Sequence, residues 1–182
     1  IIGGNLRGKK LASLSGSSIR PTADRLRESI FNIIAARVPE AMVLDLFAGS
    51  GAFGIEALSR GARAVVFIDN SRAAVTVIYS NLKMCRFLDR ARVILCDITR
   101  GLDSIPISQP RFDLVFMDPP YDRGLVRDGL NLFRRYSILA PDHCLILEHS
   151  SREPLPCGLE GYVLHDQRRY GKTLVSFLEG ML

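Results

Sequence analysis

Five short apolar runs recur along the chain, and stretches with helical spacing separate them. The runs are AMVLDLF (41–47), ARAVVFIDN (62–70), ARVILCDIT (91–99), FDLVFMDPP (112–120) and HCLILEHS (143–150). Nearly continuous apolar strands are typical of parallel sheets that helices cover on both faces. Expected helices lie at 52–60, 71–87 and 124–137, with a weaker one at 99–104. The alternation predicts an α/β fold with a mostly parallel sheet.

Two further segments precede and follow this alternation. Residues 20–38 (RPTADRLRESIFNIIAARV) predict an amphipathic helix, since four apolar residues recur at helical spacing: Leu26, Ile30, Ile33 and Ile34. Residues 161–179 (GYVLHDQRRYGKTLVSFLE) contain two strand-like runs joined near RRYGK. They predict an antiparallel hairpin at the edge of the sheet, which then has seven strands.

The length of 182 residues suits one domain with a single core. Hydrophobic residues make up 47% of the chain and charged residues 24%, as in compact globular proteins. We expect one domain over residues 1–182. Within it, residues 1–19 are expected to form a basic N-terminal hairpin extension, and residues 20–182 the catalytic core.

The excess positive charge lies at the N-terminus. The first 27 residues hold one anion, Asp24, and six cations: Arg7, Lys9, Lys10, Arg20, Arg25 and Arg27. The rest of the chain is balanced, with 18 cations and 18 anions, so this segment accounts for the whole net charge of +5. Concentrated positive charge favours a polyanion, because each neutralised phosphate releases counterions. We expect a nucleic-acid partner.

Several classes of protein do not fit the sequence. No apolar run approaches the roughly 18 residues of a membrane span, and residues 1–20 lack the apolar block of a signal peptide. The four cysteines are widely spaced, with no C-x-x-C pair and no histidine at metal-ligand spacing. We therefore expect a cytoplasmic protein with reduced thiols, no metal and no membrane contact.

The stretch DLFAGSGAFG carries the pattern G-x-G-x-x-G at Gly49, Gly51 and Gly54. In dinucleotide enzymes this turn brings backbone N–H groups and a helix N-terminus against a pyrophosphate. The carboxylate of Asp45, on the strand that leads into the turn, would repel that anion. It would attract a ligand that carries an ammonium group, such as S-adenosylmethionine.

Further acids follow the next strands. Asp69, at the end of the second run, would bind ribose hydroxyls of either a dinucleotide or S-adenosylmethionine. Asp97, after the third run, is placed to receive an adenine amino group. Another acid, Glu148, falls near the end of the last parallel run. Only S-adenosylmethionine explains Asp45, so we take it as the expected cofactor.

The fourth run ends in Asp118-Pro119-Pro120-Tyr121. This sequence places a carboxylate, a carbonyl without a competing N–H, and an aromatic ring at the edge where ligands bind. The arrangement suits methylation of an amino nitrogen on a planar base, whose lone pair is delocalised into the ring. Asp118 and the Pro119 carbonyl can accept the two amine protons, and Tyr121 can stack on the base. No metal or covalent nucleophile is needed.

The chain resembles the RsmD family of class I S-adenosylmethionine-dependent methyltransferases, which methylate guanine N2 in bacterial 16S ribosomal RNA. The resemblance rests on five stretches: IIGGNLRGKKL at the start, RPTADRLRESIFN (20–32), DLFAGSGAFGIEALSRGA (45–62), DPPY (118–121) and RRYGKTLVSF (168–177). It implies a Rossmann-like methyltransferase fold. DPPY also occurs in DNA adenine-N6 and protein glutamine-N5 methyltransferases, so the N-terminal stretches carry the narrower assignment.

The resemblance implies roles for individual residues. The cofactor site comprises Arg20, Thr22, Asp45, Phe47, Gly49, Gly51, Asp69, Asn70 and Asp97. The amine is held by Asp118, Pro119, Pro120 and Tyr121. RNA contacts involve Arg7, Lys9, Lys10, Arg25 and Arg27, whereas Arg168 and Arg169 either touch RNA phosphates or belong to a solvated hairpin. The substrate would be 16S rRNA in a small-subunit assembly intermediate, with ribosomal proteins completing the surface and the enzyme acting as a monomer.

Three alternatives remain open at this point. An adenine-N6 methyltransferase acting on DNA or RNA would use the same catalytic residues. An NAD-type oxidoreductase would explain the literal glycine pattern. A non-catalytic RNA-binding assembly factor could retain the scaffold, although the intact DPPY sequence argues against it.

Overall fold

The computed structural model of the chain describes residues 1–14, 21–102, 111–121, 123–153, 155, 159 and 161–181. For Pro21 and Thr22 it describes the backbone alone.

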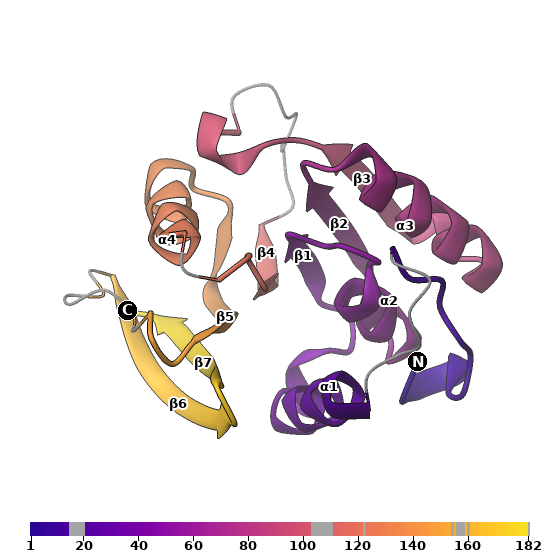
Figure 1. Cartoon of the computed structure of the whole chain (residues 1–182), viewed down its shortest axis with the longest axis horizontal. Helices are drawn as coiled ribbons and strands as arrows, with labels where there is room; N and C mark the ends of the chain where they lie inside the picture. The colour runs from indigo at the N-terminus through magenta and orange to yellow at the C-terminus, as the bar shows by residue number, and fades with distance from the viewer. Residues whose placement is uncertain are drawn as a thin grey trace.

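A seven-stranded sheet runs through the described part of the chain, in the order β3-β2-β1-β4-β5-β7-β6 (Figure 1). Its strands are β1 (Met42–Leu46), β2 (Ala64–Asp69), β3 (Ala91–Leu95), β4 (Phe112–Met117), β5 (Leu139–Ser150), β6 (Tyr162–Tyr170) and β7 (Thr173–Gly180). Strands β1 to β5 pair in parallel, and β7 runs antiparallel to β5 and β6. The predicted sheet and its edge hairpin are confirmed.

The strand order reverses between β1 and β4, which lie side by side although the chain leaves β1 toward β2. In open α/β sheets the ligand crevice lies beyond the carboxyl ends of the strands at such a point. The topology therefore directs attention to the residues that follow β1 and β4.

Within the described residues, four α-helices cover the sheet: α1 (Pro21–Ile33), α2 (Ala52–Ser59), α3 (Arg72–Cys85) and α4 (Leu125–Arg135). Helices α1, α2 and α3 pack on one face, and α4 packs on the other (Figure 1). The three expected interior helices are confirmed. The first helix is shorter than predicted, because it ends at Ile33 and a 3₁₀ turn follows at Ala35–Arg37. In the described part of 99–104 there is only the end of a 3₁₀ turn, Ile98–Arg100.

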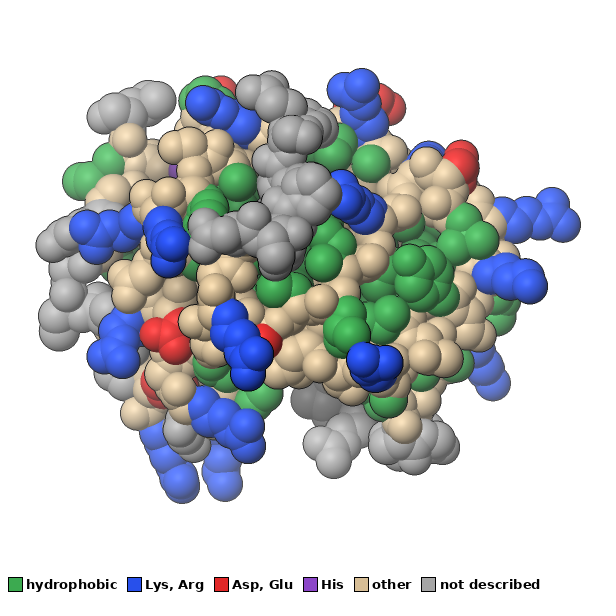
Figure 2. Space-filling view, turned by 90° about the horizontal axis from the view of Figure 1, so that it is seen from above, with side chains coloured by type: hydrophobic (Ala, Val, Ile, Leu, Met, Phe, Trp, Pro, Cys, Tyr) green, Lys and Arg blue, Asp and Glu red, His purple; other side chains and the backbone are tan. Residues whose placement is uncertain are grey.

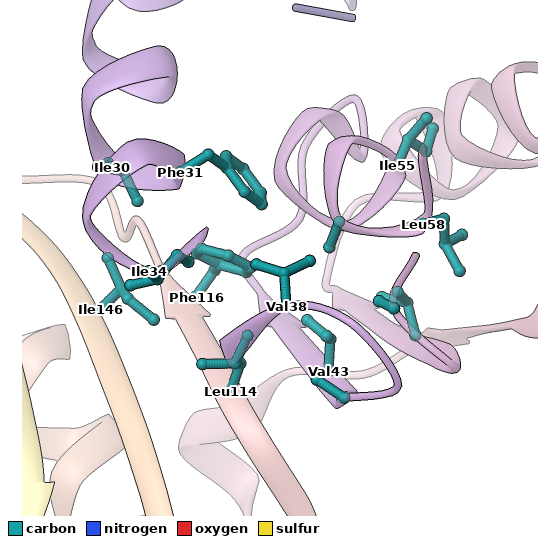
Figure 3. Packing of buried hydrophobic residues seen from close by; sticks show 14 of the residues in the cluster. Ile30, Phe31, Ile34, Val38, Val43, Ile55, Leu58, Leu114, Phe116 and Ile146 are labelled. Atoms are coloured by element: carbon teal, nitrogen blue, oxygen red, sulfur yellow. The ribbon is translucent and has the colours of Figure 1, made fainter. Parts of the chain in front are cut away.

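Aromatic packing fixes α1 on the sheet. Figure 3 shows Phe31 of α1 and Ile34, which follows α1, gathered near Phe116 of β4 and Ile146 of β5. The ring centroids of Phe31 and Phe116 are 5.4 Å apart, and those of Phe53 and Phe116 are 5.1 Å apart. Burial of each such ring contributes roughly 1.5–3 kcal/mol. The last turn of α1 and the first turn of α2 are thereby held over β4.

Three acids lie on the same face of the sheet as α1 and α2. Side chains two residues apart on a strand point to the same face. Asp45 therefore shares a face with Val43, and both lie on the side of α1 and α2. By the same spacing, Asp118 follows Phe116 on that face, and Glu148 follows Ile146. Three carboxyl groups thus reach the end of the sheet beneath the same two helices.

The N-terminal segment doubles back on itself and packs against α2. Residues 1–14 contain a 3₁₀ turn at Gly4–Leu6 and no β-strand, and the N–H of Gly8 donates to the carbonyl of Ile1 at 2.9 Å. The carboxylate of Glu56, fully buried in α2, accepts hydrogen bonds from the N–H groups of Ile2 (2.8 Å) and Gly3 (2.7 Å). The segment bonds to a side chain of α2 rather than to a partner strand.

Asn81 of α3 links the N-terminal segment to the glycine turn. Its side-chain oxygen accepts from the N–H of Ala12 at 2.8 Å. Its amide nitrogen donates to the carbonyls of Ala12 (3.0 Å) and Ser50 (2.9 Å). The position of the turn thus depends on both α3 and the segment that precedes α1.

Candidate active site

Two adjoining cavities open at the carboxyl ends of the strands. The larger, of about 870 Å³, lies beyond β2 and β3 and is lined in part by Asp69, Asn70, Asp97, Ile98 and Pro119. The smaller, of about 540 Å³, lies beside α1 and is lined in part by Leu26, Asp45, Phe53, Tyr170 and Thr173. We call them the β2–β3 lobe and the α1 lobe. Five residues border both lobes: Phe47, Gly49, Asp118, Tyr121 and Glu148. The lobes therefore form one cleft.

The three glycines have different structural roles. Gly49 (φ +56°) and Gly51 (φ +77°) have left-handed backbone angles, and Gly51 begins α2 without lining either lobe. A Cβ atom on Gly54 would lie 2.3 Å from the ring of Phe67, so this glycine lets α2 pack directly on β2. Phe47 also has a positive φ (+60°), a conformation that costs a residue with a side chain roughly 1–2 kcal/mol.

Asp45 occupies the anion-binding end of α2. One of its carboxylate oxygens accepts a hydrogen bond from the N–H of Gly54 at 2.9 Å, in the first turn of the helix. Its other oxygen has no partner among the described residues, although the side chain is buried. Burial raises the pKa of Asp45 to about 8, the Gly54 N–H opposes this, and the Asp69 charge adds to it. A pyrophosphate here would meet a carboxyl group, whereas an ammonium would supply the missing partner.

Two acids of the β2–β3 lobe are anchored by local hydrogen bonds. Asp69 accepts from the N–H of Gly49 at 2.8 Å and from the N–H of Ser71 at 2.8 Å, so it ties the glycine turn to the end of β2. Asp97 accepts from both the hydroxyl (2.7 Å) and the N–H (3.1 Å) of Thr99. These bonds, the hydroxyl first, lower the pKa of Asp97, which keeps it ionised. The exposed Asn70 lines the same lobe.

The Asp118-to-Tyr121 sequence follows β4 directly and reaches the border between the lobes. Asp118 is open to the cleft, yet protein surrounds it closely enough that desolvation raises its pKa, and repulsion from Glu148 and Asp45 adds to the rise. The hydroxyl of Tyr121 donates to Glu148 at 2.8 Å and lies 3.0 Å from the hydroxyl of Thr173. Burial keeps the pKa of Tyr121 above its usual value, so the phenol stays neutral.

The predicted RNA-contacting cations divide into two groups. Five are exposed: Arg7, Lys10, Arg25, Arg168 and Arg169. Arg27 is buried, pairs with Asp24 at 2.8 Å and lies 3.9 Å from Glu56, so its guanidinium is anchored within the protein, and its contact with RNA stays a prediction. Lys9 is half-buried and donates to the carbonyl of Met84. The predicted cofactor residue Arg20 and the Thr22 side chain lie outside the described residues.

Three residues of the cleft carried no role in the sequence analysis. Thr173 and Tyr170 come from the hairpin, and nothing in the local sequence shows that they reach the cleft. Glu148 could have been found, because it lies near the end of the strand beside Asp118, but its bond to Tyr121 joins residues 27 positions apart. Among the described residues no group of His, Cys, Asp and Glu could hold a metal ion, and no helix is long and apolar enough to cross a membrane.

Comparisons with known proteins agree with this geometry. Residues 1–179 match a family model described as "Conserved hypothetical protein 95". A proposed rRNA methyltransferase of Bacillus subtilis, YlbH, is 36% identical over 97% of this chain and 96% of its own. Ribosomal RNA small subunit methyltransferase D of Escherichia coli is 35% identical over 95% of this chain and 85% of its own.

Solved structures give the same result. The Escherichia coli protein yhhF superposes with a TM-score of 0.83 at 33% identity, covering 99% of this chain and 96% of its own. The sequence matches and this superposition extend over the sheet, the glycine turn and the cleft together, which excludes the oxidoreductase alternative. The chain belongs to the RsmD family of S-adenosylmethionine-dependent methyltransferases and has their Rossmann-like class I fold.

Proposed function

We propose that the protein methylates the exocyclic N2 of one guanine in 16S rRNA, within an assembly intermediate of the small ribosomal subunit. Relatives that are 33–36% identical bear the names of ribosomal RNA methyltransferases, two of them of the small subunit. The observation that carries the proposal is the cleft itself, in which Asp118 and Tyr121 border two lobes. One is suited to a nucleoside, and the other contains Asp45, one of whose carboxyl oxygens has no partner among the described residues.

The residues present fit S-adenosylmethionine. The free oxygen of Asp45 would pair with its ammonium group, and Asp69 retains lone pairs for ribose hydroxyls. Asp97, kept ionised by Thr99, would accept from the adenine amino group. Phe47, Gly49 and Asn70 would line the path between these acids. When bound, the cofactor supplies a methyl group on a positively charged sulfur.

The chain's own residues orient the amine. Asp118 and the carbonyl of Pro119 would accept the two N2 protons, so that the nitrogen lone pair points into the cleft. Pro120 has no N–H to compete for these acceptors. Positioning of this kind, with acceptors where positive charge develops on nitrogen, is the main catalytic contribution.

Tyr121 would receive the base. Its ring is 38% exposed, while its hydroxyl is anchored by Glu148 and Thr173. Because its hydroxyl is already anchored, the Tyr121 side chain loses little further rotational freedom when a base stacks on its ring. Stacking of a base on such a ring contributes roughly 1–3 kcal/mol, which offsets the cost of taking the base out of its stack.

Exposed cations would hold the RNA beside the cleft. Arg25 and Arg168 line a shallow groove of about 520 Å³ between α1 and β6, and Tyr170 links this groove to the α1 lobe. The face in Figure 2, which is the top of Figure 1 and lies away from α1 and β6, also carries basic side chains with few acidic ones among them. These contacts give affinity without sequence preference. Selection of one nucleotide therefore requires the folded subunit and its ribosomal proteins, on which the enzyme would act as a monomer in the cytoplasm.

The test uses small subunits from a strain that lacks the gene. They are incubated with the purified protein and methyl-labelled cofactor, and the RNA is digested to nucleosides. Label in N2-methylguanosine is expected, whereas label in N6-methyladenosine would overturn the proposal in favour of the adenine alternative. Asp118→Ala should lower the turnover number at least about 100-fold and leave S-adenosylhomocysteine binding unchanged. Unaffected methylation would remove the proposed role of Asp118.

A further inference from the structure

We propose that Glu148 reads the N1–H of the target guanine, and so selects guanine over adenine while Asp118 holds the amine. The proposal rests on the proposed function, since it names the residue by which that same site distinguishes its substrate. Three observations support the proposal. The strand register places Glu148 beside Asp118, Tyr121 anchors its side chain, and the donors of guanine match the acceptors that the cleft offers.

The register places the two acids side by side. Met117 of β4 lies opposite Leu147 of β5, so the next residues, Asp118 and Glu148, are neighbours where the pairing of these two parallel strands ends. Such strands are about 4.8 Å apart. Both side chains lie on the α1 face of the sheet, and both border both lobes of the cleft. A purine amine held by Asp118 would therefore have Glu148 beside it.

Tyr121 fixes one oxygen of Glu148. The Tyr121 hydroxyl donates to Oε1 at 2.8 Å, and the Thr173 hydroxyl lies 3.0 Å from the Tyr121 hydroxyl. The second oxygen, Oε2, has no partner among the described residues. The base that stacks on Tyr121 thus meets a carboxylate whose orientation is set by that same tyrosine.

The acceptors match guanine. Along its Watson–Crick edge, guanine presents N1–H beside the two N2 protons, which makes three donors. The cleft offers three acceptors for them: Asp118, the Pro119 carbonyl and the free oxygen of Glu148. Adenine presents an acceptor at N1, and its lone pair would face a carboxylate without an intervening proton. A site strongly rejects a substrate that leaves two hydrogen-bond acceptors facing each other without a proton between them.

Charge in the cleft favours the same substrate. Asp118 and Glu148 repel each other, which contributes to the raised pKa of Asp118, and burial raises the pKa of Glu148. Two described cationic side chains line the cleft. Arg27 is already paired with Asp24, and Arg123 forms no ion pair with Asp118 or Glu148. The N1–H and N2 amine of guanine, which are all donors, would relieve this repulsion.

The test substitutes the amide for the acid. In Glu148→Gln, the Tyr121 hydroxyl would still donate to the side-chain oxygen, so the NH₂ group would face the base. The substitution therefore replaces an acceptor by a donor at that position. The substrates are small subunits rebuilt with guanine or with 2-aminopurine at the methylated nucleotide. 2-Aminopurine keeps the N2 amine but has an acceptor at N1. The measured quantity is the ratio of kcat/KM for the two bases.

Wild-type protein should prefer guanine by roughly 10- to 100-fold, and Glu148→Gln should lose or invert that preference. Glu179→Gln, at the opposite end of the neighbouring strand β7, is the matched control and should behave as wild type. Binding of S-adenosylhomocysteine confirms that each variant is folded. If Glu148→Gln does not fold, equal methylation of the two bases by wild type would still overturn the proposal.

The two proposals fail in different ways. If wild-type protein methylates no guanine, the proposed function is wrong. If it methylates guanine but Glu148→Gln keeps the wild-type ratio of the two bases, the function stands and the role of Glu148 is wrong. Tyr121→Phe in the Glu148→Gln background should restore part of the guanine preference, because the amide is then free to turn over.

Discussion

Replacing Asp45 by asparagine should make the protein more stable and unable to bind its cofactor. The carboxyl group is buried, and its pKa is raised from 3.8 to about 8. An acid whose folded pKa is raised must take up a proton on folding, so its contribution to stability falls as pH rises from 3.8 to about 8. At pH 7 this penalty spans about three pH units, or at most about 4 kcal/mol.

The Asp45→Asn substitution would remove the penalty, because the amide oxygen can still accept from the N–H of Gly54 and the amide has no proton to take up. For a protein of this size each kcal/mol corresponds to roughly 2–4 °C in Tm. The assay is thermal denaturation from pH 5 to pH 8, with and without S-adenosylhomocysteine, which carries the same ammonium group. The Tm difference between variant and wild type should grow with pH, and the ligand should stabilise only wild type.

Asp113→Asn is the matched control, since Asp113 also accepts a backbone N–H, that of Met42 at 2.8 Å, but lies outside both lobes. It should leave the response to ligand unchanged. A Tm for Asp45→Asn below that of wild type across the pH range, or ligand stabilisation equal to that of wild type, would refute the reasoning from buried charge.

Three further outcomes are expected. Binding of S-adenosylhomocysteine at pH 7 should release close to one proton, because an ammonium lowers the pKa of Asp45 from about 8; calorimetry in phosphate and in Tris should then give different heats, and identical heats would contradict the ion pair. Gly54→Ala should lower the unfolding free energy by roughly 1–3 kcal/mol in denaturant titrations, because the new Cβ would lie 2.3 Å from the ring of Phe67; an unchanged midpoint would show that α2 can shift. Arg25→Ala with Arg168→Ala should weaken RNA binding and reduce the slope of log affinity against log salt by up to about 2, with S-adenosylhomocysteine affinity unchanged; an unaltered slope would remove these cations from the interface.

Local patterns were sufficient to predict the frame of the site. Apolar runs with acids at their ends located β1, β2 and β4, and strand alternation then fixes the face on which Asp45 and Asp118 lie. The glycine turn was predicted from its letters, and the carboxylate of Asp45 indicated which charge the ligand carries. These features depend on residues within a few positions of one another, which a sequence displays directly.

Contacts between distant segments were the part that could not be predicted. Arg27 was predicted only as an RNA contact, because nothing near it in sequence shows that the buried Glu56 lies 3.9 Å away. The N-terminal segment was expected to be a hairpin because its glycines suggest a turn, and nothing in its sequence shows that its N–H groups bond to that same Glu56 of α2. The roles of Glu148 and Thr173 depend on the Tyr121 hydroxyl, which only the assembled sheet brings to them.

The most direct test of the account is mass spectrometry of 16S rRNA from cells with and without the gene. The account predicts one N2-methylguanosine that is absent without the gene and is restored by the wild-type protein but not by Asp118→Ala. Identical RNA from the two strains, or loss of a methyl group from an adenine instead, would contradict it.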